Sequence, residues 1–184
     1  SPDYFIENQQ GRNPHDDLDP SRSALIVINH VKEGLELGRE QHLPRVVLDA
    51  IVQHHGTHLL TFFHDRAVKT EGATAVDEAT YRYPGPKPQS RTMGVLMLAD
   101  AVEAAGRTLS EPNAEVIHNL VAKVTDSHVG DGQLDESGLS LGDLRAVKQE
   151  FELVLSSLHH RRVDYPGFDF DGPPAESRLQ VVSR

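Results

Sequence analysis

The sequence predicts an all-α fold. Its apolar residues recur at steps of three and four in at least five segments, the spacing that places them on one face of an α-helix. Most of these segments begin at a proline or a helix-capping residue, and none shows the sustained alternation typical of a half-buried strand. The chain has 184 residues, 38% of them hydrophobic, which is enough for one domain with a sizeable core. We therefore expect a helical bundle.

Two helices are predicted in the first third of the chain. Residues 1–20 carry Asn, Gly and Pro at short intervals, which indicates an ordered loop. Asp19 then caps a helix that has Pro20 at its first position. The apolar stripe of this helix consists of Ala24, Val27, Ile28, Val31 and Leu35. A second helix starts at Leu43-Pro44 with a stripe of Val47, Leu48, Ile51 and Val52, so that His54 and His55 follow what is expected to be a buried face.

The middle of the chain predicts one long helix after an irregular stretch. Residues 67–79 are expected to hold a short helix between turns. The segment 83–88, YPGPKP, cannot be helical because its prolines lack the backbone donor and restrict the residues before them. Ser90 then caps a helix that runs to about Leu109. This helix is apolar nearly all round, so we expect it at the centre of the core, with Asp100 in its middle.

Two further helices are predicted before the C-terminus. One begins at Ser110-Glu111-Pro112, and its stripe is Val116, Ile117, Leu120, Val121 and Val124. Residues 126–138 form an expected connector, which lacks the glutamate that a calcium-binding loop needs. Ser140 and Asp143 then make a capping box for a last helix that ends near 159–162. We expect one domain over residues 1–165 and a tail or linker over 166–184.

Composition excludes several classes of function. The formal net charge of −10 argues against binding to polymeric nucleic acid, because the surface of such a protein would be positive. The absence of cysteine excludes disulfides and thiolate metal sites, so that any metal must be held by His, Asp and Glu. No apolar run approaches the roughly 20 residues that span a bilayer. The chain begins at Ser1-Pro2, and we expect it to be a soluble fragment of a longer protein.

Three histidines and one aspartate form a candidate metal site: His30, His54, His55 and Asp100. Adjacent helical positions point about 100° apart, so His54 and His55 are expected to serve two neighbouring ions, or one ion and one phosphate. The alternative is that paired histidines are a surface or satisfied core feature. A buried Asp100 needs a partner, and a metal and a structural role remain equal alternatives, the latter being a salt bridge to Arg107 or a cap to a neighbouring helix.

Other histidine patterns fail as motifs. His54 and His58 have the spacing of zinc proteases, but His55 stands where those enzymes need a glutamate. The dipeptides His15-Asp16 and His64-Asp65 are unsurprising in a chain with 11 histidines, and we interpret both as coincidental. His118 and His128 are expected on the surface. There is neither a glycine-rich phosphate loop nor a nucleophilic serine motif.

Several strings in the chain carry a specific resemblance. They are YFIENQ (4–9), GRNPHD (11–16), SALIVINHVKEG (23–34), VQHHGTH (52–58), YRYPGPKPQSR (81–91), MLADAVEAAGR (97–107) and GQLDESGLSLGDL (132–144). Together they resemble the cytoplasmic HD domain of the seven-transmembrane HD proteins of the PgpH type, in the HD superfamily of metal-dependent phosphohydrolases. The resemblance implies an HD-type helical bundle and hydrolysis of cyclic di-AMP to pApA. It also implies attachment to the cytoplasmic face of a bacterial membrane through segments outside this chain.

The resemblance also implies a ligand set. His30 matches the family's lone later histidine, His54 and His55 its adjacent pair, and Asp100 its closing aspartate. These residues would help hold two divalent transition metals, iron or manganese, with Asp100, His54 and His55 central to catalysis. The family's first histidine and its His-Asp pair would precede Ser1, so we expect partial or no metal occupancy and an inactive fragment. Loss of N-terminal helices would expose apolar surface, which predicts that the fragment either forms a homo-oligomer or rearranges to cover that surface.

Substrate contacts are expected from basic and aromatic residues near the ligand set. Lys87, Arg91 and Arg107 are candidate phosphate contacts in an otherwise acidic chain, and Tyr83 and Tyr4 are candidates to stack on adenine. For Lys87 and Arg91 the alternative is a solvated loop charge. For the domain as a whole, the alternative is a nucleotide-binding relay domain of a membrane signalling protein that does not hydrolyse its ligand.

Overall fold

The computed structural model describes residues 14–110 and 112–159, and this part of the chain is all-α. The helices are α1 (Pro20–Glu40), α2 (Arg45–Gln53), α3 (Thr61–Glu71), α4 (Arg91–Gly106), α5 (Ala114–Gly130) and α6 (Leu141–His159). Two short 3-10 helices, η3 (Pro14–Asp17) and η4 (Glu78–Tyr81), accompany them. Within the described ranges the extended pairing is a single bridge between Leu59 and Arg82. The predicted all-α class is confirmed.

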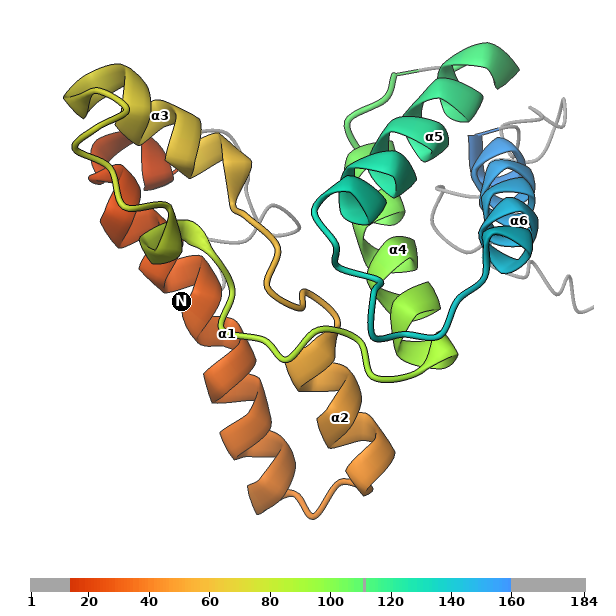
Figure 1. The fold of residues 1–184 in the computed structure, drawn as a ribbon, viewed down its shortest axis with the longest axis horizontal. Helices are drawn as coiled ribbons and strands as arrows, with labels where there is room; N and C mark the ends of the chain where they lie inside the picture. The colour runs from red at the N-terminus through yellow and green to blue at the C-terminus, as the bar shows by residue number, and fades with distance from the viewer. Residues whose placement is uncertain (1–13, 111, 160–184) are drawn as a thin grey trace, which may run out of the picture.

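The helices form two groups, each with its own core (Figure 1). In the N-terminal group, α3 and η4 pack on α1 around Ala24, Phe63, Ala67 and Tyr81. In the C-terminal group, α4, α5 and α6 pack together around Met97, Leu98, Val102 and Val121. The groups meet where α2 contacts α4. Segments from both groups therefore converge at this junction.

The helix starts follow from local capping. The Asp19 carboxylate accepts a hydrogen bond from Ser21 N at the start of α1, as predicted. The Ser90 hydroxyl accepts one from Met93 N at the start of α4. Ser140 and Asp143 form the predicted capping box of α6, in which each residue accepts a backbone hydrogen bond from the other. These three starts were correctly predicted because each depends on residues adjacent in sequence.

Several predicted boundaries are wrong. The short helix lies at Thr61–Glu71 rather than at 67–79, and it ends at Gly72, which has a positive φ. α5 starts after Asn113, not at Ser110, and it continues to Gly130, so that the first part of the expected connector is helical. Val47 of the expected α2 stripe is 39% exposed. The expected domain boundary at residue 165 lies outside the described residues.

None of the helices within residues 14–110 and 112–159 is both long and apolar enough to span a bilayer.

We expect Asn113→Ala to lower the free energy of unfolding by about 1 kcal/mol, because the Asn113 side chain caps α5 by accepting a hydrogen bond from Val116 N. Urea denaturation measures this change. Ser110→Ala is the matched control, since Ser110 precedes the helix start and its replacement should stay within about 0.5 kcal/mol of the unchanged protein. Equal losses for the two variants would contradict the start of α5 given above.

Candidate functional site

Three histidines meet at the junction between the two groups of helices. His30 lies on α1, His54 follows the last residue of α2, and His55 comes next. One ring nitrogen from each lies within 4.8 Å of the other two, a spacing that can hold a metal ion. We call these three residues the histidine cluster. The structure thus brings together the three predicted histidine ligands.

His54 and His55 converge although they are adjacent in sequence. Their ring centroids are 3.9 Å apart, with the ring planes inclined by 38°. The expectation that they diverge by about 100° is wrong, because it assumed that the helix continues through both residues. α2 ends at Gln53, and residues 54–57 form a turn. Because of this turn, the side chains of His54 and His55 can both point toward the same metal-binding position.

Backbone carbonyls bind one ring nitrogen of His30 and one of His54. Nδ1 of His30 donates a hydrogen bond to the Val27 carbonyl, and Nδ1 of His54 donates one to the Ile51 carbonyl at 2.8 Å. In each neutral ring the proton is therefore on Nδ1 and the lone pair is on Nε2. The two Nε2 atoms face each other at 3.3 Å. Two lone pairs cannot hydrogen-bond to each other, whereas a cation placed beside them would accept both. A backbone carbonyl on the opposite nitrogen is also the usual second partner of a metal-bound histidine.

His55 is held between an aromatic ring and a carboxylate. Tyr83 stacks on the His55 ring at a centroid distance of 4.3 Å. On the other side, Nδ1 of His55 lies 3.6 Å from an Asp100 carboxylate oxygen. Burial, followed by the neighbouring His54 and His30, lowers the pKa of His55 to about 2. The ring is therefore neutral at physiological pH, the form that binds metals.

Asp100 approaches the cluster from α4, in the other group of helices. Its side chain is 44% exposed, so the premise that it is buried within the core is wrong. The helix is central, but the face that carries Asp100 is turned out of the core toward His55. Arg107, the alternative partner, forms a 2.6 Å ion pair with Glu103. His30, His54 and His55 thus lie together, and Asp100 lies beside His55. The nitrogen and oxygen donors of these four predicted ligands suit a divalent transition metal.

The turn that carries His54 and His55 is joined to the α5–α6 loop by Gln133. Its side-chain oxygen accepts a hydrogen bond from Thr57 N at 2.9 Å, and its amide group donates to the Thr57 hydroxyl and to Asp131, both at 2.9 Å. Arg82 completes the network by donating to the Thr57 carbonyl at 2.9 Å and to both Asp131 oxygens. Gln133 is 1% exposed. These hydrogen bonds fix the turn at residues 54–57 to the C-terminal group of helices.

The sequence reasoning missed Gln133, Arg82 and Asp131 as supports of the site. Gln133 and Asp131 fall in the stretch 126–138, which was interpreted as a connector. The available signal was the resemblance, since Gln133 lies in GQLDESGLSLGDL and Arg82 in YRYPGPKPQSR. Spacing alone gave no signal, because the partners are about 50 to 76 residues apart.

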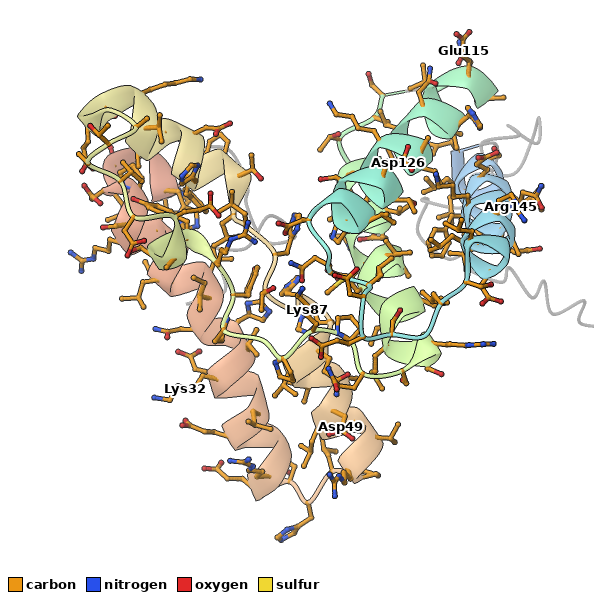
Figure 2. All side chains as sticks on the ribbon, viewed as in Figure 1. Lys32, Asp49, Lys87, Glu115, Asp126 and Arg145 are labelled. Carbon is orange, nitrogen blue, oxygen red and sulfur yellow. The ribbon has the colours of Figure 1, made fainter. Side chains whose placement is uncertain are left out.

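The predicted substrate-contact residues lie in several different parts of the structure. Tyr83 is 6% exposed, and one of its faces is occupied by His55, so it supports the cluster directly. Figure 2 places Lys87 between the two groups of helices, where its ammonium lies 4.0 Å from Asp135. Arg91 donates to the Gly138 carbonyl at the start of α4. Arg107 lies at the other end of α4. Tyr4 lies outside the described residues.

One of the other histidines, His128, is not where it was expected. His128 is 5% exposed, so its assignment to the surface is wrong, and its ring stacks on His58 at 4.3 Å with an inclination of 11°. His118 is exposed as expected and contacts Glu152. His15 is buried against Phe63. His64 stays on α3, 3.8 Å from Asp65.

An all-α bundle with histidines and an aspartate gathered at a helix junction is the architecture of an HD domain. The chain is 38% identical over 166 residues to the cyclic-di-AMP phosphodiesterase PgpH of Listeria monocytogenes serotype 1/2a (strain 10403S). It is 40% identical over 166 residues to the cyclic-di-AMP phosphodiesterase PgpH of Bacillus subtilis (strain 168). Both alignments cover 90% of this chain and 23% of the relative, so the chain spans less than a quarter of their length. No family model matches the chain.

Solved structures agree with these relatives. The HD domain of L. monocytogenes PgpH in complex with cyclic-di-AMP superposes with a TM-score of 0.81 at 37% identity, covering 85% of this chain and 73% of that one. A second structure of the same HD domain gives a TM-score of 0.80 over 86% and 74% of the two chains. The chain belongs to the PgpH family of HD domains.

We expect Gly56→Ala to destabilise the protein by at least about 1 kcal/mol more than Gly72→Ala, as measured by urea denaturation. Both glycines have a positive φ, but a Cβ on Gly56 would lie 2.6 Å from the Gln133 side-chain oxygen, whereas a Cβ on Gly72 would meet nothing within 4 Å. The same Cβ would lie 2.7 Å from Met97 Cε, so the difference reports the displacement of Gln133 from Thr57 together with that of the Met97 side chain. Equal losses of stability for the two variants would show that both side chains move aside freely.

Asp131 should make stability depend on pH. The hydrogen bonds from Arg82, followed by those from Gln133, hold the pKa of Asp131 below its usual value. The folded state then binds its proton less readily than the unfolded state, whose pKa is about 3.9, so the stabilisation is present above about pH 4 and is lost as the pH falls through the folded pKa. Asp131→Asn should therefore lower the free energy of unfolding at pH 7, and its difference from the unchanged protein should narrow below about pH 4.

The control for this prediction is Asp126→Asn, since Asp126 forms an ion pair with Lys148 and its side chain is 70% exposed. Such exposed pairs contribute little, so we expect a change of less than about 1 kcal/mol at any pH. Denaturation at a series of pH values measures both variants. Stability curves for Asp131→Asn and the unchanged protein that run parallel down to pH 2 would contradict the prediction.

Proposed function

We propose that this chain is a metal-dependent phosphodiesterase domain that hydrolyses cyclic di-AMP to pApA. The observation that carries the proposal is the convergence of His30, His54 and His55, of which one ring nitrogen each lies within 4.8 Å of the other two. The relatives support the substrate, because two are named cyclic-di-AMP phosphodiesterases and a solved relative contains cyclic-di-AMP.

The metal-holding residues we propose are His30, His54, His55 and Asp100, within a site for two divalent transition metals, iron or manganese. The chemistry such cations supply is Lewis-acid: formation of a hydroxide nucleophile near neutral pH and stabilisation of charge in the phosphodiester transition state. In the proposed function His54, His55 and Asp100 are catalytic as ligands. His55 presents a neutral ring whose orientation is held by Tyr83 and Asp100.

Binding of the phosphate is proposed to involve Lys87 more than Arg91 or Arg107. Lys87 follows the loop that carries Tyr83, and its nearest anionic partner, Asp135, is 4.0 Å away and well exposed, so the ammonium can transfer to a phosphate at small cost. Arg91 and Arg107 lie at opposite ends of α4, where each is engaged by a group of the protein. Their proposed contribution is attraction of the anionic substrate rather than direct contact. Adenine stacking on Tyr83 requires its face away from His55.

The domain is further proposed to work within a larger protein at the cytoplasmic face of a membrane. The length of the relatives supports this, since the aligned region covers 23% of each. Apolar side chains on α6, among them Leu141 and Leu153, are well exposed and support self-association. Light scattering tests the self-association, and a protein that stays monomeric at all concentrations would contradict it.

We expect the intact protein to cleave cyclic di-AMP with added Mn²⁺, and His54→Ala and Asp100→Ala each to lower kcat/KM by more than about 100-fold, beyond the 10–100-fold typical of outer-shell changes. The reason is that each variant removes a proposed ligand. Chromatography of the pApA product measures the rate, and elemental analysis of the purified variants should show a parallel loss of metal.

The matched control is His118→Ala, because His118 is exposed, pairs with Glu152 of α6 and lies outside the histidine cluster. This variant should keep both its metal and its activity. Full activity in Asp100→Ala would contradict the assignment of that ligand. Binding of cyclic di-AMP without any hydrolysis would support the alternative of a nucleotide-binding relay domain.

A further inference from the structure

Residues 83–89, which we call the proline loop, lie beside the segment that carries the histidine pair. At one end of the loop, Tyr83 N donates a hydrogen bond to the His58 carbonyl at 3.1 Å. At the other end, Gln89 N donates one to the side-chain oxygen of Gln53 at 2.8 Å. The pairing runs in opposite directions along the two segments, so they are antiparallel. The loop is therefore anchored to the histidine segment at both of its ends.

The middle of the proline loop packs closely on the turn that follows the histidine pair. A Cβ on Gly85 would lie 3.0 Å from the Thr57 side chain, and a Cβ on Gly56 would lie 3.4 Å from Pro88 Cδ. Pro88 is itself fully buried. The loop and the turn thus touch along their length, which leaves the loop little freedom as long as both anchors hold.

Few backbone donors are available to anchor the proline loop. Pro84, Pro86 and Pro88 have no backbone N–H, so only the residues beside and between them can donate. The N–H of Gln89 is one of these few donors, and its acceptor is a side chain instead of a backbone carbonyl. Gln53 is 6% exposed, so water has little access to take its place as the acceptor. The anchor at this end of the loop therefore depends on one side chain.

Gln89 connects this anchor to Lys87. The side-chain amide of Gln89 donates to the Lys87 carbonyl at 3.0 Å and also to the Glu136 carboxylate. Lys87 lies between two prolines, whose rings hold φ at about −65°, so the direction of its backbone follows that of the loop. Figure 2 shows its side chain between the two groups of helices. The place of the Lys87 ammonium thus depends on where Gln89 is held.

We propose that Gln53 is a positioning residue that acts through Lys87. Gln53 is the last residue of α2 and directly precedes His54. By holding Gln89, it fixes the distance between the histidine cluster and the ammonium that contacts the phosphate of the nucleotide. The inference rests on the proposed function and deepens it, because it assigns the residue that sets the spacing between the metal ligands and the phosphate contact.

A double-mutant cycle in the intact protein, with cyclic di-AMP and added Mn²⁺, tests this inference. Gln53→Met keeps the approximate length of the side chain but removes the acceptor. We expect it to raise KM about fivefold and to leave kcat within about twofold, because substrate binding is weakened while the metal ligands stay in place. Lys87→Met should raise KM about tenfold, as expected for loss of one hydrogen bond to a charged group. The double variant should match Lys87→Met alone, since the anchor acts only through the ammonium.

Two measurements that do not use activity accompany the cycle. Amide hydrogen exchange should become faster at Gln89 in Gln53→Met, because that N–H loses its acceptor. Elemental analysis should show the same metal content in Gln53→Met as in the unchanged protein, in contrast to His54→Ala. The matched control is Asn113→Ala, which weakens the cap of α5 outside the proline loop. It should alter neither KM nor the exchange of Gln89, although it lowers stability.

Three results would overturn the inference while the proposed function stands. The first is an unchanged KM in Gln53→Met or in Lys87→Met. The second is a loss of metal in Gln53→Met, which would show that Gln53 acts on the histidine ligands instead. The third is a double variant in which the two increases of KM multiply, which would show that the two residues act independently. If the unchanged protein does not hydrolyse cyclic di-AMP, the proposed function fails and the inference fails with it.

Discussion

The hydrogen bonds between Thr57 and Gln133 are the constraint on which the arrangement of the site depends. The two helix groups have separate hydrophobic cores, so polar contacts at the junction help to fix their relation. Gln133 satisfies both the backbone and the hydroxyl of Thr57 while it is itself buried. A buried network of this kind is favourable only when every polar group in it is paired, so only a small range of geometries is allowed. The positions of His54 and His55 follow from it, because they precede Thr57 in the same turn.

Much of the positive charge near the histidine cluster is suppressed or balanced within the protein. Burial lowers the pKa values of both His55 and His58, and Arg82 forms ion pairs with Asp131 and Glu78. With a formal net charge of −10, the protein as a whole repels anions. The proposed dinucleotide ligand would therefore need local positive charge in addition to Lys87, and the nitrogen and oxygen donors at the junction suit a cation as that source. The donor atoms of the site and the negative charge of the proposed ligand thus both favour a bound cation.

Local features of the fold could be predicted from the sequence, whereas long-range ones could not. The starts of α1, α4 and α6 depend on caps such as Ser90, whose partner is three residues away. The start of α5 was misplaced because Ser110 and Asn113 are both good caps, and only tertiary contacts decide between them. Asp100 was expected to be buried because its helix is apolar nearly all round, but periodicity does not reveal that a second group of helices leaves this face open. His128 was misjudged for the same reason, since its partner His58 is 70 residues away in sequence.

The division of the ligand set between the two groups has a mechanical consequence. His30 belongs to α1 and Asp100 to α4, so an ion bound by both residues would cross-link positions about 70 residues apart, much as a disulfide does. Such a link reduces the entropy of the unfolded chain by an amount that grows slowly with the length of the closed loop. It would also tie together two bodies that otherwise meet mainly through α2 and α4. Loading with metal and rigidity of the whole domain would then be a single thermodynamic event.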